Sequence, residues 1–331
     1  MSLRSSRWSF RATLAACAGA LALLAGCGGD VYEPFRPDRA ISFGDEYSYI
    51  RADGRKYTYN YLEDLSNPAT SLNCSANPVW NQIVVEEEYG FSFTQCNRGG
   101  RTGNAVAQLY AAEKAKIGDI AKQIDDFLSR GNTLSKKDLI LLQGGANDIW
   151  EIWENAGHTV TDASRAEARA RGAALGAQIN RLTAMDARVL SIDVPYQGST
   201  PKAFALTAAT PVAYPNAPTD LNVLTDEFNS GFYFSFPTNS RKAAYAQVNS
   251  LVRRIMNTDD SSRPYKFRDV TTVSCVNVPS ALECTNTTLL GDASPVGDNW
   301  NYVFADERFF TPTVNRLMGN LARDRADEHP F

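Results

Sequence analysis

The chain has 331 residues, of which 44% are hydrophobic and 21% are charged, a composition typical of a globular protein with a sizeable core. This composition excludes disordered, collagen-like and coiled-coil classes. The net charge is −4, and no basic run offers the phosphate-neutralising surface that nucleic-acid binding requires, so we expect no nucleic-acid partner.

The first element along the chain is an N-terminal segment that we expect to lie outside the fold. Three arginines precede the apolar stretch 12–26, which is shorter than the ~20 residues of a membrane-spanning helix. The stretch runs into Leu24-Ala25-Gly26-Cys27, which resembles the lipobox of bacterial lipoproteins. An ordinary secretory signal peptide is the alternative interpretation.

The lipobox resemblance implies a domain organisation and a location. Residues 1–26 would be a signal peptide, and residues 27–39 would be the lipidated Cys27 followed by a tether to the membrane. Gly28 stands where an inner-membrane retention signal usually has Asp. The resemblance therefore implies a lipid-anchored protein of the bacterial cell envelope, held in the outer membrane.

The remaining cysteines predict two disulfides. An even number, Cys74, Cys96, Cys275 and Cys284, is left in a chain that we expect to be exported. Three pairings are possible, and the closeness of Cys275 and Cys284 favours that pair, with Cys74–Cys96 as its complement. Neither spacing is CxxC and the chain has only two histidines, so we expect no metal site. No glycine-rich phosphate loop is present, and we expect no cofactor.

Residues 40–325 alternate predicted strands and helices, and residues 326–331 form a charged tail. The apolar runs predict buried strands at 40–43, 91–94, 139–142 and 189–192, with 265–273 as a fifth candidate. Helical periodicity is found at 106–128, 164–185, 241–256 and 313–325. This order predicts one α/β domain, a three-layer α/β/α sandwich around a parallel sheet of about five strands. Ligands of such sheets bind beyond the carboxyl ends of the strands.

Four segments, most of them at predicted strand ends, resemble in order the motifs of the SGNH or GDSL family of esterases and lipases. They are Gly44-Asp45-Glu46, the glycine-rich segment 97–102, Gly144-Gly145-Ala146-Asn147-Asp148, and Asp306-Glu307-Arg308-Phe309. The resemblance covers about residues 40–322 and implies flavodoxin-like strand order.

The family resemblance assigns a role to each position. It implies that Glu46 occupies the nucleophile position in place of Ser, and that Phe309 occupies the base position in place of His. Asp306 is at the position that orients the base, and Gly100, through its backbone N–H, and Asn147, through its amide, are the implied oxyanion-hole donors. Because acyl transfer needs both a nucleophile and a base, the proton relay is missing at both ends.

The surviving acidic residues leave alternatives open. The Glu46 carboxylate could accept hydrogen bonds from Gly100 N–H and the Asn147 amide, standing in for the oxyanion, or it could be a solvated carboxylate at a helix start. Asp306 could pair with Arg308 or Arg101, or serve only as a cap. Glu46 and Asp306 together could also act as the carboxylate pair of a glycosidase, which we favour least.

Other side chains could in principle replace the lost relay. Ser48 and His158 are the candidates, although a turn that presents Glu46 does not present its second neighbour equally, and a loop histidine is usually solvated. His329 lies in the charged tail. Trp150 and Trp153 fit core packing better than an acyl-chain groove.

Our leading hypothesis is a lipid-anchored envelope protein with a degenerate ester-hydrolase site and a binding or structural role. Its expected partner is an acyl or ester-like small molecule, or a cell-envelope protein. The first alternative is an active carboxylic-ester hydrolase that uses Ser48, Glu46 or His158. The second is an envelope-assembly or surface-interaction lipoprotein that uses the outer face of the fold.

Overall fold

A computed structural model describes residues 35–68, 70–237, 241–257, 265–296 and 300–328. The predicted signal peptide, Cys27 and most of the tether lie outside these residues, as does His329. Arg36–Phe331 forms one compact unit. Among the described residues, no helix combines the length and the apolar character needed to cross a membrane.

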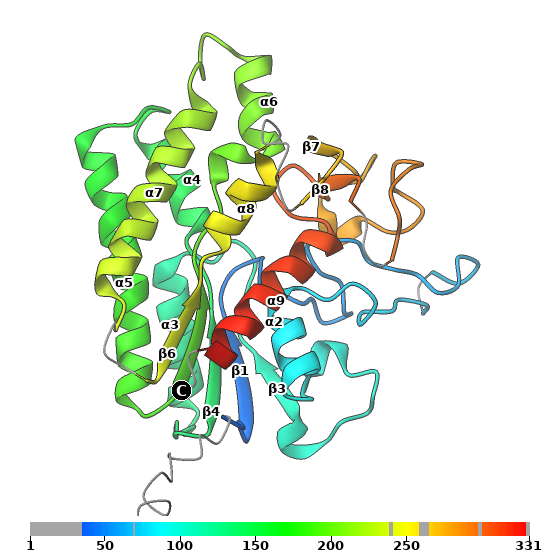
Figure 1. The fold of residues 1–331 in the computed structure, drawn as a ribbon, viewed down its shortest axis with the longest axis vertical. Coiled ribbons are helices and arrows are strands. Elements are labelled where there is room, and N and C mark those ends of the chain that lie inside the picture. The colour runs from blue at the N-terminus through cyan, green and yellow to red at the C-terminus, as the bar shows by residue number, and fades with distance from the viewer. Residues whose placement is uncertain (1–34, 69, 238–240, 258–264, 297–299, 329–331) are drawn as a thin grey trace, which may run out of the picture. The chain divides into compact units, whose positions relative to one another are not determined.

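The centre of the unit is a six-stranded sheet in which every neighbouring pair is parallel (Figure 1). Its strands, in the spatial order β2-β3-β1-β4-β5-β6, are Ser92–Phe93, Val106–Leu109, Arg39–Phe43, Asp138–Leu142, Arg188–Ile192 and Ala243–Ala246. Without the short edge strand β2 this is flavodoxin-like order. β4 is buried along its whole length because strands or helices cover it on every side.

Helices cover both faces of the sheet, which gives the predicted three-layer sandwich (Figure 1). One layer contains α3 (Ile117–Ser129), α4 (Ala146–Asn155), α5 (Asp162–Ala184) and α7 (Ala217–Ser235). The other contains α2 (Trp80–Gln82), which continues as a π-helical turn at Ile83–Glu88, α8 (Val248–Met256) and α9 (Pro312–Glu328). The short helix α6 (Pro201–Ala209) precedes α7 and packs against it.

Glycines bring α5 and α7 into backbone contact. A Cβ atom added to Gly172 would lie 1.9 Å from the Phe228 carbonyl oxygen, and one added to Gly231 would lie 2.0 Å from the Arg169 carbonyl oxygen. Any side chain at these positions would overlap backbone atoms, which cannot rotate away. The glycines therefore set the distance between the two helices.

Three predicted elements were wrong in part. The segment 106–128 is not one helix, because it begins with β3 and its helix starts only at Ile117. Likewise, 241–256 begins with β6 before α8. Both strands have only four residues, too few for a period of two to be distinguished from a helical one.

The third correction concerns the fifth strand candidate. β7 (Asp269–Val273) does not join the central sheet but pairs in parallel with β8 (Tyr302–Phe304) in a separate two-stranded sheet. Its residues are half-buried or exposed, unlike the central strands.

Both predicted disulfides are present. Cys74–Cys96 and Cys275–Cys284 each have Cα atoms 5.7 Å apart. The Cys275 backbone N–H also donates to the Ala305 carbonyl, at 2.9 Å, so this loop is attached directly to the residue before Asp306.

Candidate functional site

A tight turn at the carboxyl end of β1 positions Glu46. Gly44 leaves room for this turn, because a Cβ atom there would lie 2.6 Å from the Gln143 carbonyl oxygen. Asp45 is fully buried, and its carboxylate accepts a hydrogen bond from the Tyr47 N–H at 3.0 Å and one from the Gln143 amide at 3.2 Å. Burial, and then the neighbouring Glu46 charge, raise the pKa of Asp45 well above its usual value. Asp45 thus holds the turn from inside.

The Glu46 carboxylate is bound at both of its oxygens. Oε2 accepts from the Asn147 side-chain amide at 2.7 Å, and Oε1 accepts from the Lys114 backbone N–H at 2.8 Å. The Glu46 residue is only 4% exposed. Two N–H donors from different segments therefore bind one carboxylate at the end of β1, each at a different oxygen; donors of this kind stabilise an oxyanion in acyl transfer.

One of these donors is not the residue that we expected. Gly100 lies in an exposed loop, where its N–H donates to the Asn97 carbonyl at 3.2 Å and so does not bind Glu46. Lys114, in the segment that follows β3, takes that place with a left-handed backbone, φ +58°. Lys114 was not expected here because the predicted helix 106–128 included both β3 and the segment that follows it.

Asn147 lies in the first turn of α4 and connects three parts of the site. Its Nδ2 donates to Glu46 and to the Ala115 carbonyl at 3.1 Å, while its Oδ1 accepts from the Arg308 Nη2 at 3.0 Å. A single amide therefore links the acidic Glu46 to the basic Arg308.

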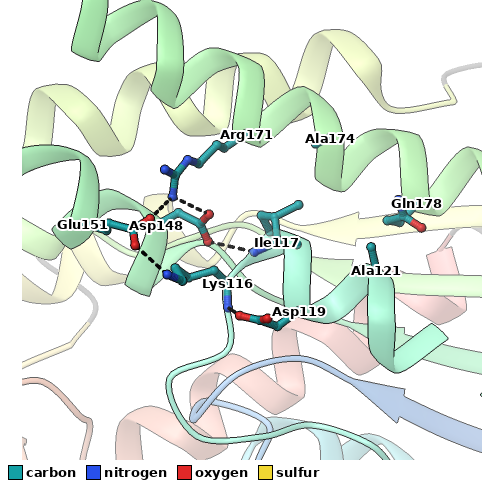
Figure 2. A pocket seen from close by; sticks show the side chains of 10 residues that line it. Lys116, Ile117, Asp119, Ala121, Asp148, Glu151, Arg171, Ala174 and Gln178 are labelled. Atoms are coloured by element: carbon teal, nitrogen blue, oxygen red, sulfur yellow. Dashed lines mark hydrogen bonds and ion pairs between the residues drawn. The ribbon is translucent and has the colours of Figure 1, made fainter. Parts of the chain in front are cut away.

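An ion-pair network fixes the helix that carries Asn147 (Figure 2). The buried Asp148 carboxylate accepts from the Ile117 N–H at the start of α3 and from Arg171 of α5, each at 3.1 Å. Burial raises the pKa of Asp148, and Arg171 opposes this effect. Glu151 then joins Arg171 to Lys116, and these side chains line a cavity of about 410 Å³. Because Lys116 and Arg171 are ion-paired with Asp148 and Glu151, we interpret this cavity as structural.

Asp306 is saturated by backbone groups. Its carboxylate accepts from the N–H groups of Ala281, Arg308 and Phe309 at 2.7, 2.8 and 2.8 Å. Burial raises its pKa, and these three hydrogen bonds oppose the shift. Of the expected partners, Arg308 bonds Asp306 only through its main chain, and the Arg101 guanidinium donates to Ser92. Asp306 thus holds its own loop in place.

The position expected for the base is filled by an aromatic cluster. Phe309 is 5% exposed, and its ring centroid lies 5.2 Å from that of Tyr47 and 4.5 Å from that of Tyr57. No proton acceptor stands on the Phe309 side chain. Burial also raises the pKa of Tyr47 above its usual range, so its hydroxyl stays protonated.

The alternative relay residues contact other parts of the fold. Ser48 is fully buried, and its Oγ accepts from the Trp80 indole N–H at 3.1 Å. The His158 ring packs against Trp153 and Tyr214, with centroids 4.6 Å apart in both cases. Trp150 and Trp153 are 4% and 1% exposed, as core residues are.

Comparisons with known proteins give distant structural matches only. No family model and no curated protein matches the sequence. A lipase/acylhydrolase from Enterococcus faecalis is 12% identical with a TM-score of 0.39, over 88% of this chain and 98% of that one. An acetyl xylan esterase variant from Geobacillus stearothermophilus is 10% identical with a TM-score of 0.29, over 66% of this chain and 82% of that one. These values carry no argument about what this chain does.

Proposed function

We propose that the chain is a lipid-anchored cell-envelope protein with an ester-hydrolase fold of the SGNH/GDSL type, and that it binds an acyl or ester-like molecule without hydrolysing it. One observation supports this most directly. The Glu46 carboxylate occupies the Asn147 amide and the Lys114 N–H, the donors that would otherwise face a developing oxyanion.

The chemistry of the remaining groups agrees with a loss of hydrolysis. Serine-type acyl transfer passes a proton from the nucleophile to an imidazole that a carboxylate orients. Here the hydrocarbon ring of Phe309 cannot accept that proton, and Asp306 directs its oxygens to three backbone N–H groups. The site therefore keeps hydrogen-bond donors for an oxyanion but lacks the nucleophile and the base that would generate one.

Ester hydrolysis by designed variants tests this proposal. We would measure p-nitrophenyl acetate turnover by the purified protein beside Glu46→Ser, Phe309→His and the double variant. We expect the wild type and both single variants to be inert, and the double variant to turn over. In the double variant, Asn147→Ala should lower kcat by about 100-fold, the usual effect of losing one oxyanion donor.

Two results would contradict the proposal. Hydrolysis by the wild type, abolished by Ser48→Ala or His158→Ala, would establish a different relay. A correctly folded double variant that shows no turnover would mean that restoring the nucleophile and the base is not enough, because the donors Asn147 and Lys114 or the carboxylate of Asp306 do not serve the reaction.

The membrane anchor needs its own experiment. The proposal rests on the Leu24-Ala25-Gly26-Cys27 sequence, and acylation there should place the protein in the membrane fraction. Cys27→Ser should release it into the soluble fraction and abolish incorporation of labelled palmitate. Retention of label in Cys27→Ser would show that Cys27 is not the lipidated residue.

A further inference from the structure

Two basic side chains lie over the same buried indole beside the site. The Lys202 Nζ atom is 4.7 Å from the Trp150 ring centroid, and the Arg308 guanidinium carbon is 5.8 Å from it. Lys202 is at the start of α6, and Arg308 is in the loop before α9. Both side chains are half-buried, so they remain accessible from solvent.

Hydrogen bonds hold this group in place before any ligand arrives. The Trp150 indole N–H donates to Gln197 at 3.0 Å, which fixes the ring. The Lys202 backbone N–H donates to the Glu307 carbonyl at 2.9 Å, which attaches the start of α6 to the Arg308 loop. Arg308 in turn donates to Asn147. These contacts reduce the ordering that a ligand must impose.

Within the described parts of the chain, neither cation has a carboxylate at ion-pair distance. Other half-buried arginines near the site do have carboxylate partners, as Arg171 has three. The charges of Asp306 and Asp45 attract Arg308 without a direct contact to its guanidinium. The oxygens of both carboxylates accept hydrogen bonds from other groups. The Arg308 Nε atom is buried and has no hydrogen-bond partner in that same part of the chain.

Two cations that lie within 6 Å of one indole centroid, without a carboxylate at ion-pair distance, are unfavourable in a partly buried setting, and the indole compensates them only in part. A bound anion would remove the imbalance. Arginine binds carboxylates through its planar set of donors, and lysine adds a point charge.

We propose that Arg308 and Lys202, held by Trp150, bind the carboxylate group of a small organic acid. The planar guanidinium of Arg308 carries paired N–H donors that fit the two oxygens of a carboxylate, and Lys202 adds a second positive charge. The inference deepens the proposed function by naming the chemical class of the ligand, a carboxylic acid in its ionised form. It rests on the proposed function in one respect, namely that the site binds its ligand and does not cleave an ester.

Binding of 4-fluorobenzoate, followed by ¹⁹F NMR, tests this site against two other probes. 4-Fluorobenzyl alcohol has a similar shape without the charge, and inorganic phosphate serves as a competitor. The variants are Arg308→Gln and Lys202→Gln, with Lys122→Gln as a matched control, since Lys122 is an exposed lysine on α3. Circular dichroism checks the fold of each variant.

We expect the wild type to bind the benzoate at least ten-fold more tightly than the alcohol. Arg308→Gln and Lys202→Gln should each weaken benzoate binding by about ten-fold, and Lys122→Gln should not. Glu46→Gln should tighten benzoate binding several-fold. This substitution removes a negative charge that would repel the benzoate and that is joined to Arg308 through the Asn147 amide.

Several results would overturn the inference. They are equal affinity for both fluorinated probes, no binding of either, unchanged affinity in both cation variants, or an equal loss in Lys122→Gln. Tighter binding of phosphate than of benzoate would overturn the carboxylate assignment. Hydrolysis of p-nitrophenyl acetate by the wild type would refute the proposed function without changing these affinities, so the two failures are distinguishable.

Discussion

A lysine buried away from the site makes the stability of this protein depend on pH. Lys56 is 1% exposed, and its Nζ donates to the Cys74 and Asn77 carbonyls at 2.5 and 2.6 Å. Burial lowers the pKa of Lys56 from 10.5 to about 7, although the Glu86 carboxylate acts in the opposite direction. Replacing this side chain by Met removes the titration while keeping most of the volume.

The sign and the size of the effect follow from linkage. Between pH 7 and 10.5 the unfolded chain binds a proton at Lys56 that the folded chain does not, so the stability of the wild type rises with pH. The full lowering of the Lys56 pKa corresponds to about 5 kcal/mol of folding stability. The protein has this stability above pH 10.5 and loses it as the pH falls to 7. About 2 kcal/mol of this change falls between pH 7 and pH 9.

Urea unfolding at pH 7, 8 and 9 measures the difference. We expect the free energy of unfolding of the wild type, relative to Lys56→Met, to increase by about 2 kcal/mol over this range. The carbonyls that lose their donor in the variant shift its stability by an amount that does not depend on pH. Lys122→Met, at an exposed position, should follow the wild type. Parallel curves for the wild type and Lys56→Met would refute the reasoning, because they would mean that Lys56 keeps its proton when buried.

Three further substitutions test the local structure by urea unfolding. Gly172→Ala should lower the free energy of unfolding by about 3 kcal/mol through overlap with the Phe228 carbonyl, whereas Gly118→Ala, at an exposed position of α3, should raise it by about 0.5 kcal/mol. Similar values for the two variants would disprove the close contact of α5 with α7. Lys114→Gly should be neutral or stabilising by up to about 1 kcal/mol, whereas Lys114→Val should destabilise the fold by about 1–2 kcal/mol, because the backbone at this position is left-handed. The reverse order of stability would rule out that conformation. Asp306→Ala should cost about 2 kcal/mol by leaving three N–H groups without an acceptor, and an unchanged stability would show that water replaces the carboxylate.

The central strands could be predicted because their sequences are unambiguous. The runs at β1, β4 and β5 are mostly apolar, interrupted only by Ser42 and Ser191, as expected for strands covered on both faces, and the structure places all three side by side. β3 and β6 escaped prediction because each is short and runs within a few residues of a helix, so its pattern merges with the helical period.

The contact of Glu46 with Asn147 could be anticipated from the resemblance of their segments to known motifs. The second hydrogen bond to Glu46, from the Lys114 N–H, could not. The donor at Lys114 depends on where β3 ends and on a left-handed backbone, which no side-chain pattern encodes at a lysine. The position of Arg308 over Trp150 likewise depends on how the loop before α9 meets α4 and α6.

The contacts around Asn147 also bear on when the site can form. Asn147 is 101 positions from Glu46 and 161 from Arg308 along the chain, so the three meet only through long-range closure. Such closures slow folding, because the chain loses entropy before the contacts form. Since Arg308 follows β6 by many residues, a nascent polypeptide contains every strand of its sheet well before it contains every residue of its site. A product truncated before Arg308 would therefore contain the sequences of β1 to β6 yet leave the Asn147 carbonyl without its Arg308 donor.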